Sequence, residues 1–112
     1  MAETRSVVTA TIPSGSTVSN AIDCNDRSVI GFVAPAAWTA ATLAIEVSID
    51  GTNWITAILD TTSTALCTYA AVTAGAGYPV DVFGLLPWQF IRFKSGANQA
   101  AARSFSVISR PL

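Results

Sequence analysis

The stretch that most constrains the fold is Leu43–Ile49, where apolar side chains alternate strictly with small or polar ones. The apolar side chains expected on one face are Ile45, Val47 and Ile49. Strict alternation predicts a β-strand with one buried and one solvated face. Asp50–Asn53 follows with turn chemistry, because Gly51 accepts positive φ and the Asp and Asn side chains can bond the nearby backbone.

The segment before this strand predicts a second, buried strand. Val29–Ala34 is a continuous apolar run that stops at Pro35. A helix over Ala36–Leu43 is disfavoured because the segment is short and carries β-branched Thr39 and Thr42. We therefore expect a strand, a proline-bounded loop and the alternating strand in succession.

The remaining chain divides into short strand-like runs separated by turn-forming residues. The runs are Arg5–Ile12, Thr17–Ile22, Trp54–Leu59, Ala65–Val72, Tyr78–Phe83, Gln89–Lys94 and Ala101–Ser109. About eight strands at this spacing are typical of a sandwich or small barrel. We predict an all-β fold, a single-domain antiparallel β-sandwich over residues 1–112 that is jelly-roll-like, with residues 1–5 as a flexible arm.

Two of these runs also make finer predictions. Pro79 favours an edge position for its strand, because proline cannot donate to the sheet ladder. In the run Gln89–Lys94, Ile91 and Phe93 are expected to point inward, with Arg92 and Lys94 outward.

The low charge limits the kinds of partner. Only 12% of the 112 residues are charged, against roughly 25% in a typical soluble domain. Such a surface suits a protein packed against neighbours, and it also suits a small β domain coated with Thr and Ser. The cations are scattered at Arg5, Arg27, Arg92, Lys94, Arg103 and Arg110. Nucleic-acid binding is not expected, because it needs clustered Lys and Arg.

Neither a signal peptide nor a membrane span is expected. The start, Met1–Arg5, lacks the basic-then-apolar pattern of a signal peptide, so we expect synthesis in the cytoplasm. The uncharged stretch Thr61–Val80 is too rich in Thr, Gly and Pro for a membrane span. Cytoplasmic synthesis favours free thiols at Cys24 and Cys67, although a disulfide between them stays open.

Catalytic groups are scarce. The chain has no histidine, which removes Ser–His and Cys–His dyads and makes a zinc site improbable. Asp23 and Asp26 could act as an acid–base pair, and with Asn25 they could hold calcium, but plain turn chemistry explains them better. We expect no enzyme activity, no cofactor and no metal.

The three tryptophans fall at loop edges, and three roles stay open for them. Trp38, Trp54 and Trp88 could cap the core, anchor a protein interface or stack on a sugar ring.

Two blocks of the sequence resemble a group of known proteins. Ile30–Thr39, Leu43–Gly51 with Trp54, and later Phe90–Gly96 with Ala101–Phe105, look like small proteins encoded among the virion genes of tailed bacteriophages. The group has no signature catalytic residue, so the resemblance implies a place in the particle and not a chemistry.

A second resemblance concerns the fold. Val47–Trp54 followed by Phe90–Phe93 is similar to the rhythm of galactose-binding-like jelly rolls of the discoidin type, with Phe90 in place of the usual tyrosine. None of the sugar-binding residues of those modules can be matched here.

Taken together, these features lead us to expect a capsid cement or decoration protein on the virion surface. It would bind the major capsid protein and copies of itself, as a homotrimer or homodimer. The candidate contact residues are Trp38, Leu85, Leu86, Trp88 and Arg5. The alternative is a tail or fibre component that binds a host-surface glycan.

Overall fold

The computed structural model describes residues 5–56, 68–80, 85 and 87–111. These residues form nine strands: β1 (Ser6–Ile12), β2 (Ile22–Asp23), β3 (Arg27–Val33), β4 (Leu43–Ser48), β5 (Ile55–Thr56), β6 (Thr68–Tyr69), β7 (Gly77–Pro79), β8 (Phe90–Ser95) and β9 (Arg103–Pro111).

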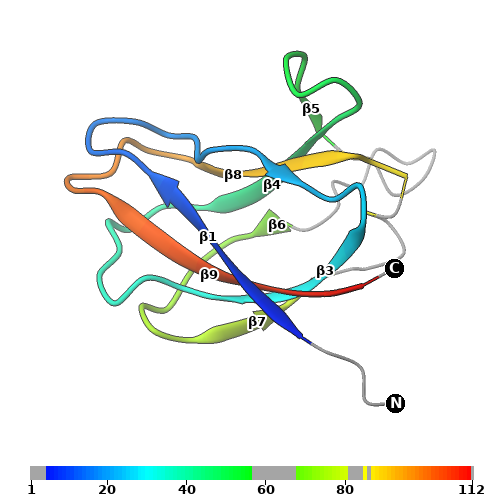
Figure 1. Cartoon of the computed structure of the whole chain (residues 1–112). Coiled ribbons are helices and arrows are strands. Elements are labelled where there is room, and N and C mark those ends of the chain that lie inside the picture. The colour runs from blue at the N-terminus through cyan, green and yellow to red at the C-terminus, as the bar shows by residue number, and fades with distance from the viewer. Residues whose placement is uncertain (1–4, 57–67, 81–84, 86, 112) are drawn as a thin grey trace.

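The strands build two packed sheets (Figure 1). One sheet has the order β1-β9-β3-β7, and the other has the order β2-β8-β4-β5 with β6 also paired to β4. Every strand pair is antiparallel. The chain crosses between the sheets at almost every connection, which is the winding of a jelly roll. The predicted all-β antiparallel sandwich is confirmed.

An aromatic cluster fills the space between the sheets. Phe93 on β8 stacks on Phe105 on β9, with ring centroids 4.6 Å apart and planes at 5°. Phe32 on β3 meets both rings edge-on, at 5.0 Å and 5.8 Å. All three side chains are almost fully buried. Because β8 belongs to one sheet and β3 and β9 to the other, this cluster joins the two layers.

The alternating strands behave largely as predicted. Leu43, Ile45 and Val47 of β4 are buried while Ala44 and Glu46 face outward and are half-buried. In β8, Ile91 and Phe93 are buried, whereas Arg92 is half-buried and Lys94 is exposed, as expected. Pro79 lies on β7, an edge strand, which confirms its predicted position.

Ile49 was wrongly expected on the buried face. It is 71% exposed, because β4 ends at Ser48. The backbone N–H groups of Asp50 and Gly51 donate to the Ser48 hydroxyl, at 3.2 and 2.9 Å, and so start the turn before Ile49 can continue the alternation. Gly51 has φ +78°, as the turn interpretation requires.

The predicted strand Thr17–Ile22 is also mostly wrong. Only Ile22 belongs to a strand, and Val18 makes an isolated bridge to Lys94. The reason is Ser19, whose backbone N–H donates to the Phe93 carbonyl while its hydroxyl accepts the Phe93 N–H, each at 2.9 Å. A side-chain oxygen thus takes the place of a ladder carbonyl.

Three predicted strands are described only in part. Within Trp54–Leu59 the described residues form β5, whose Ile55 and Thr56 are both exposed. Within Ala65–Val72 they form β6, and within Tyr78–Phe83 they include the last two residues of β7. Residues 57–59, 65–67 and 81–83 of these predictions lie outside the described residues. The loop expected over Ala36–Thr42 is confirmed, because that segment has no regular structure.

We predict that the aromatic cluster dominates stability. Phe93→Ala should lower the free energy of unfolding by about 4 kcal/mol, because it removes a buried ring and leaves a cavity between the sheets. The measurement is urea denaturation followed by tryptophan fluorescence. Phe90→Ala on the same strand is the matched control, since Phe90 is only half-buried. Equal losses for the two variants would contradict the assigned role of the cluster.

Candidate functional site

The predicted contact residues lie at opposite ends of the sandwich. Trp38 follows the end of β3, beside the loop that leaves β8. Trp88 and Leu85 precede the start of β8, and Arg5 precedes β1 at that same end. Leu86 lies outside the described residues. The structure therefore does not bring these residues into one patch.

Trp38 caps the core at its end. Its ring meets Phe105 edge-on at 5.6 Å, and its Nε1–H donates to the Ala41 carbonyl at 3.3 Å. Both the face and the polar edge of the ring thus have partners inside the molecule, which favours the core-capping role over a contact role.

Gln99 organises the loops beneath Trp38. Its side chain is buried, and its Nε2 donates to the Thr39 carbonyl at 3.2 Å and to the Ser95 hydroxyl at 2.9 Å. Its Oε1 accepts from the Thr39 N–H at 2.9 Å and from Arg103 Nε at 3.2 Å. The amide is fully satisfied, so this polar cluster is a structural clamp and offers no free group to a ligand.

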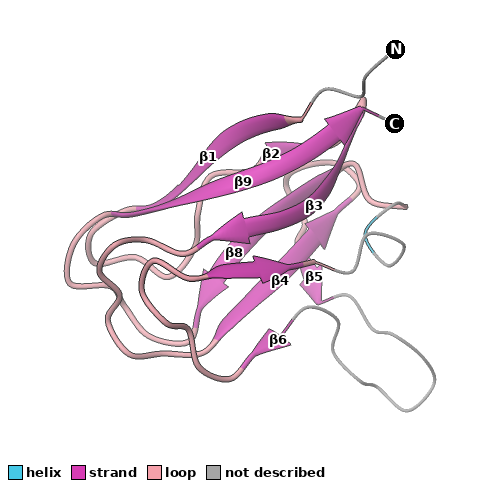
Figure 2. Ribbon diagram, turned by 90° about the horizontal axis from the view of Figure 1, so that it is seen from below, coloured by secondary structure: helices cyan, strands magenta, loops and turns pink. Residues whose placement is uncertain are grey.

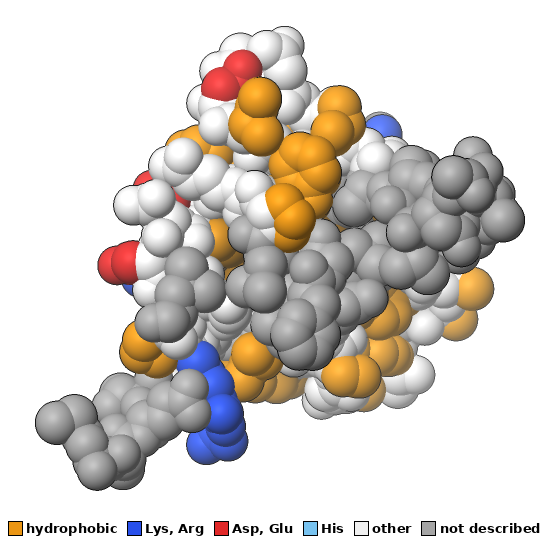
Figure 3. Space-filling view, turned by 90° about the vertical axis from the view of Figure 1, so that its right-hand side faces the viewer, with side chains coloured by type: hydrophobic (Ala, Val, Ile, Leu, Met, Phe, Trp, Pro, Cys, Tyr) orange, Lys and Arg blue, Asp and Glu red, His pale blue; other side chains and the backbone are white. Residues whose placement is uncertain are grey.

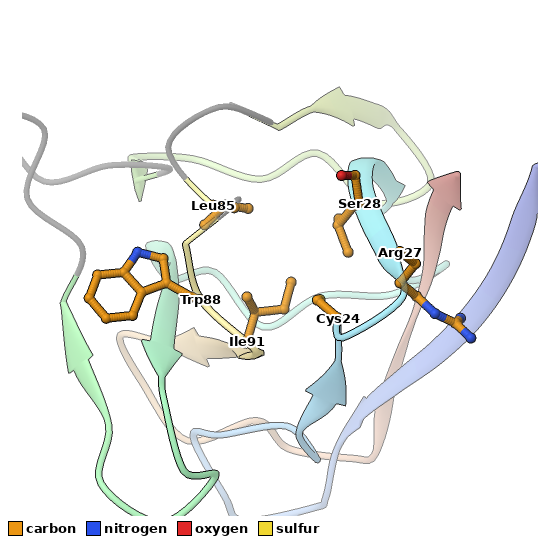
Figure 4. Close-up of a pocket in the computed structure, with 7 residues that line it drawn as sticks. Cys24, Arg27, Ser28, Leu85, Trp88 and Ile91 are labelled. Carbon is orange, nitrogen blue, oxygen red and sulfur yellow. The ribbon is translucent and has the colours of Figure 1, made fainter. Parts of the chain in front are cut away.

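At the opposite end, Trp88 and Leu85 border a small cavity (Figure 4). Cys24 and Ile91 lie between them and Arg27 in the close-up. The cavity measures about 10 Å³, which is room for about one water molecule. Leu85 is buried in the core cluster, so it lends almost no surface to a partner.

Cys24 carries a free thiol next to this cavity, and Cys67 lies outside the described residues. Burial raises the pKa of the Cys24 thiol to about 11, with a further contribution from Asp23. The thiol is therefore protonated at neutral pH, and a protonated thiol is a poor nucleophile.

The start of β3 and the start of β8 meet at this end of the sandwich, where β1 also begins and β9 ends (Figures 1 and 2). We call the exposed or half-exposed surface of this end the terminal face. The pairing of β1 and β3 with the end of β9 places Arg5 and Arg27 there, and the pairing of Ser48 with Phe90 and of Val47 with Ile55 places Ile49, Ile55 and Trp88 there. Ile49 is 71% and Ile55 50% exposed. Figure 3 looks onto this end and shows hydrophobic side chains in several patches, with acidic groups along the upper and left margins of the view.

The outer face of the second sheet carries a shallow groove of about 220 Å³. It is lined by residues of β4, β5 and β8 and the adjoining loops: Thr42, Ala44, Glu46, Thr56, Lys94, Ser95 and Gly96. The Glu46 carboxylate accepts from Arg92, with an Nη2–Oε1 distance of 2.7 Å, and Lys94 Nζ lies 3.8 Å from it. Arg92 in turn lies over the Trp54 ring at 4.5 Å. The groove therefore presents threonine hydroxyl groups and the Lys94 ammonium group to solvent.

In the described part of the chain, no group of three His, Cys, Asp or Glu side chains comes together as a metal site requires. No described helix has the length and apolar character needed to span a bilayer. The Asp23 carboxylate accepts the Asn25 N–H at 2.9 Å, which is the Asx turn expected from the sequence.

The Asp50 carboxylate accepts several hydrogen bonds in the turn that follows β4. Its Oδ1 accepts the N–H groups of Asn53 and Thr52 at 2.9 and 2.8 Å, and its Oδ2 accepts Asn53 Nδ2 at 2.8 Å. These backbone bonds, followed by the side-chain bonds from Asn53 and Ser48, hold the pKa of Asp50 well below its ordinary value. The exposed carboxylate thus organises a turn.

Comparison with known proteins shows that the fold of this chain is similar to that of a known structure. No protein-family model and no curated protein sequence matches this chain. The structure is similar to the SPBc2 prophage-derived protein YomS, with a TM-score of 0.65 and 7% identity over 98% of this chain and 96% of that one. It is also aligned with the Yersinia pseudotuberculosis-derived mitogen YPM, over 99% and 88% of the chains at 12% identity, but that TM-score of 0.43 is too low to support an argument. A small phage-derived protein therefore shares this fold.

We predict that Asp50 makes stability fall in acid. Its folded-state pKa is depressed, so its stabilising contribution is complete above the unfolded value of about 4 and is lost as the pH falls below it. The urea midpoint of Asp50→Asn, measured from pH 6 downward, should therefore decline less steeply than that of the wild type. Asp26→Asn removes the same charge from a side chain that is 81% exposed and is the control. Parallel declines for wild type and Asp50→Asn would refute the assignment.

Proposed function

We propose that this chain is a phage virion structural protein, a capsid cement or decoration protein that binds the major capsid shell through protein–protein contacts. The observation that carries the proposal is the terminal face, where Ile49 and Ile55 are exposed at the same end of the sandwich as Arg5, Arg27 and Trp88. Aromatic, apolar and arginine side chains are enriched in protein interfaces, whereas acidic side chains are depleted.

The chemistry of this end favours a protein partner over a small molecule. The cavity beside Trp88 holds about 10 Å³, whereas ligand pockets measure hundreds of cubic ångströms. The Cys24 thiol is protonated and half-buried. A surface with exposed apolar groups and no pocket can gain free energy by covering those groups against another surface.

The fold is compatible with this role, because the small prophage-derived protein YomS shares it. A cement protein stabilises a shell by mass action: it binds the assembled form and shifts assembly by RT ln(1 + [L]/Kd) at each site. Many equivalent sites on a capsid lattice then multiply a modest affinity. On this proposal the protein resides on the capsid surface of the virion after synthesis in the host cytoplasm.

Substitutions at the terminal face should weaken particle binding. We expect Ile49→Asp combined with Ile55→Asp to reduce affinity for purified capsids at least about tenfold, because two apolar contacts become charged. The readout is co-sedimentation with capsids that lack this protein. Val33→Asp changes an exposed valine at the other end of β3 and is the matched control. Equal losses for both variants, or no binding by the wild type, would refute the proposal.

A count of copies in particles supplies an independent check. Quantitative mass spectrometry of washed virions should give a ratio to the major capsid protein that is typical of a lattice component. A handful of copies per particle would instead favour a tail or fibre location.

The groove on the outer face of the second sheet favours a second candidate function, a tail or fibre component that binds a host-surface glycan. Thr42, Thr56 and Lys94 present two hydroxyl groups and an ammonium group along an open groove. These groups suit a ligand rich in hydroxyls. Trp38 and Trp88 contribute nothing to the groove, since both pack against the core at the ends of the sandwich.

Filling the groove tests the glycan candidate. If the groove binds a glycan, Ala44→Trp should abolish the strongest signal of a glycan array, because Ala44 lines the groove and faces outward. Ser106→Trp places the same ring on the exposed face of the other sheet and is the control. An array without signals, or equal signals from both variants, would eliminate this candidate.

A further inference from the structure

One sheet edge differs from the others in length and composition. The edges among the described strands are β1 and β7 in the first sheet and β2, β5 and β6 in the second. β7 has three residues and ends in Pro79, and β2, β5 and β6 have two residues each. β1 has seven residues, SVVTATI, with no charge and no proline. Short strands, prolines and charges protect an edge from pairing with another chain, and β1 has none of these protections.

The backbone of β1 shows which of its groups are available. The Thr11 N–H donates to Asn20 Oδ1 at 2.8 Å, and the Thr11 carbonyl accepts the Asn20 N–H at 3.4 Å. Thr11 therefore directs both backbone groups away from β9. The register from Ser6 to Ile12 is continuous, and backbone direction alternates with a period of two residues in an antiparallel strand. Val7 and Thr9 consequently direct their N–H and C=O groups outward as well.

We infer that β1 is a self-association edge that pairs antiparallel with β1 of a second copy, around a two-fold axis through Val7. Val7 then lies opposite Val7 of the second copy, and Thr9 lies opposite Arg5. Facing residues in such pairs exchange both backbone hydrogen bonds. This inference deepens the self-association that belongs to the proposed function, and it identifies the surface responsible.

The composition of the strand favours a second copy as the occupant. Val7 is 67% exposed, and at the two-fold axis it would be covered by an identical valine, which is a favourable cross-strand pair. The antiparallel arrangement separates the two Arg5 residues by four strand positions, about 13 Å, which exceeds the Debye length of about 8 Å at physiological salt. A parallel arrangement would place the two guanidinium groups side by side.

Asn20 sets the length of the pairing. Because it occupies the outward backbone groups of Thr11, an added strand can bond β1 only on the N-terminal side of that residue. The axis at Val7 keeps the paired segment within residues 5–9 of each copy. The two copies then share one continuous sheet, in which β1 is no longer an edge.

The test measures the mass of the purified protein, without particles, by sedimentation velocity over a concentration series. As the protein concentration rises, the measured mass of the wild type should increase from that of the monomer to twice that value. Val7→Lys should raise the dissociation constant at least about tenfold, because two ammonium groups would lie directly opposite. Thr9→Pro should also weaken the dimer, since it removes an outward N–H and leaves the bonds to β9 intact.

Ser106→Lys supplies the matched control, because it adds the same charge on the exposed face of β9, an interior strand. It should leave the dissociation constant unchanged, and circular dichroism should show native folding for all variants. A wild type that stays monomeric, a trimeric mass, or equal effects of Val7→Lys and Ser106→Lys would overturn the inference. Capsid binding through the terminal face has its own assay, so failure of self-association is distinguishable from failure of the proposed function.

Discussion

The stacked contact between Phe93 and Phe105 joins the two sheets, and the rest of the fold is arranged around it. Phe93 lies in the middle of β8, Phe105 lies near the start of β9, and Phe32 completes the cluster from a third strand. Trp38 covers Phe105 from the adjacent loop. The burial of these rings removes apolar area from water and so stabilises the packing of the two sheets, in a chain that has few charged residues.

The sequence predicted those parts of the fold that depend on local alternation. The buried and outward positions of β8 follow from period-two patterning, and the turn after β4 follows from Asp50 and Gly51. The pattern failed where a side chain replaced a backbone partner. Ser19 bonds the Phe93 backbone through its hydroxyl, and no periodicity in residues 17–22 indicates such an exchange.

The residues of the candidate surface were predictable only in part, because tertiary packing decides which of them are exposed. Trp88 was proposed as a contact from its residue type and Arg5 from its place in the N-terminal arm, but the burial of Leu85 depends on tertiary packing against the core. Ile49 was assigned to the core by its place in the alternation, and its exposure follows from the early end of β4. Ile49 and Ile55 share one end of the sandwich with Arg27 only because the two sheets pack together, and no local pattern encodes that placement.

The first and last described residues, Arg5 and Pro111, lie at the end of the sandwich that carries the terminal face, where β1 begins and β9 ends (Figures 1 and 2). The loops at the far end of the sandwich, including the turns at Gly15 and Gly75, point the opposite way. A protein held on a shell by its terminal face would therefore keep its own ends near the particle and hold those turns outward. Peptides displayed from the particle would then belong in the distal turns, whereas a tag fused to either terminus would be inserted between the protein and its support.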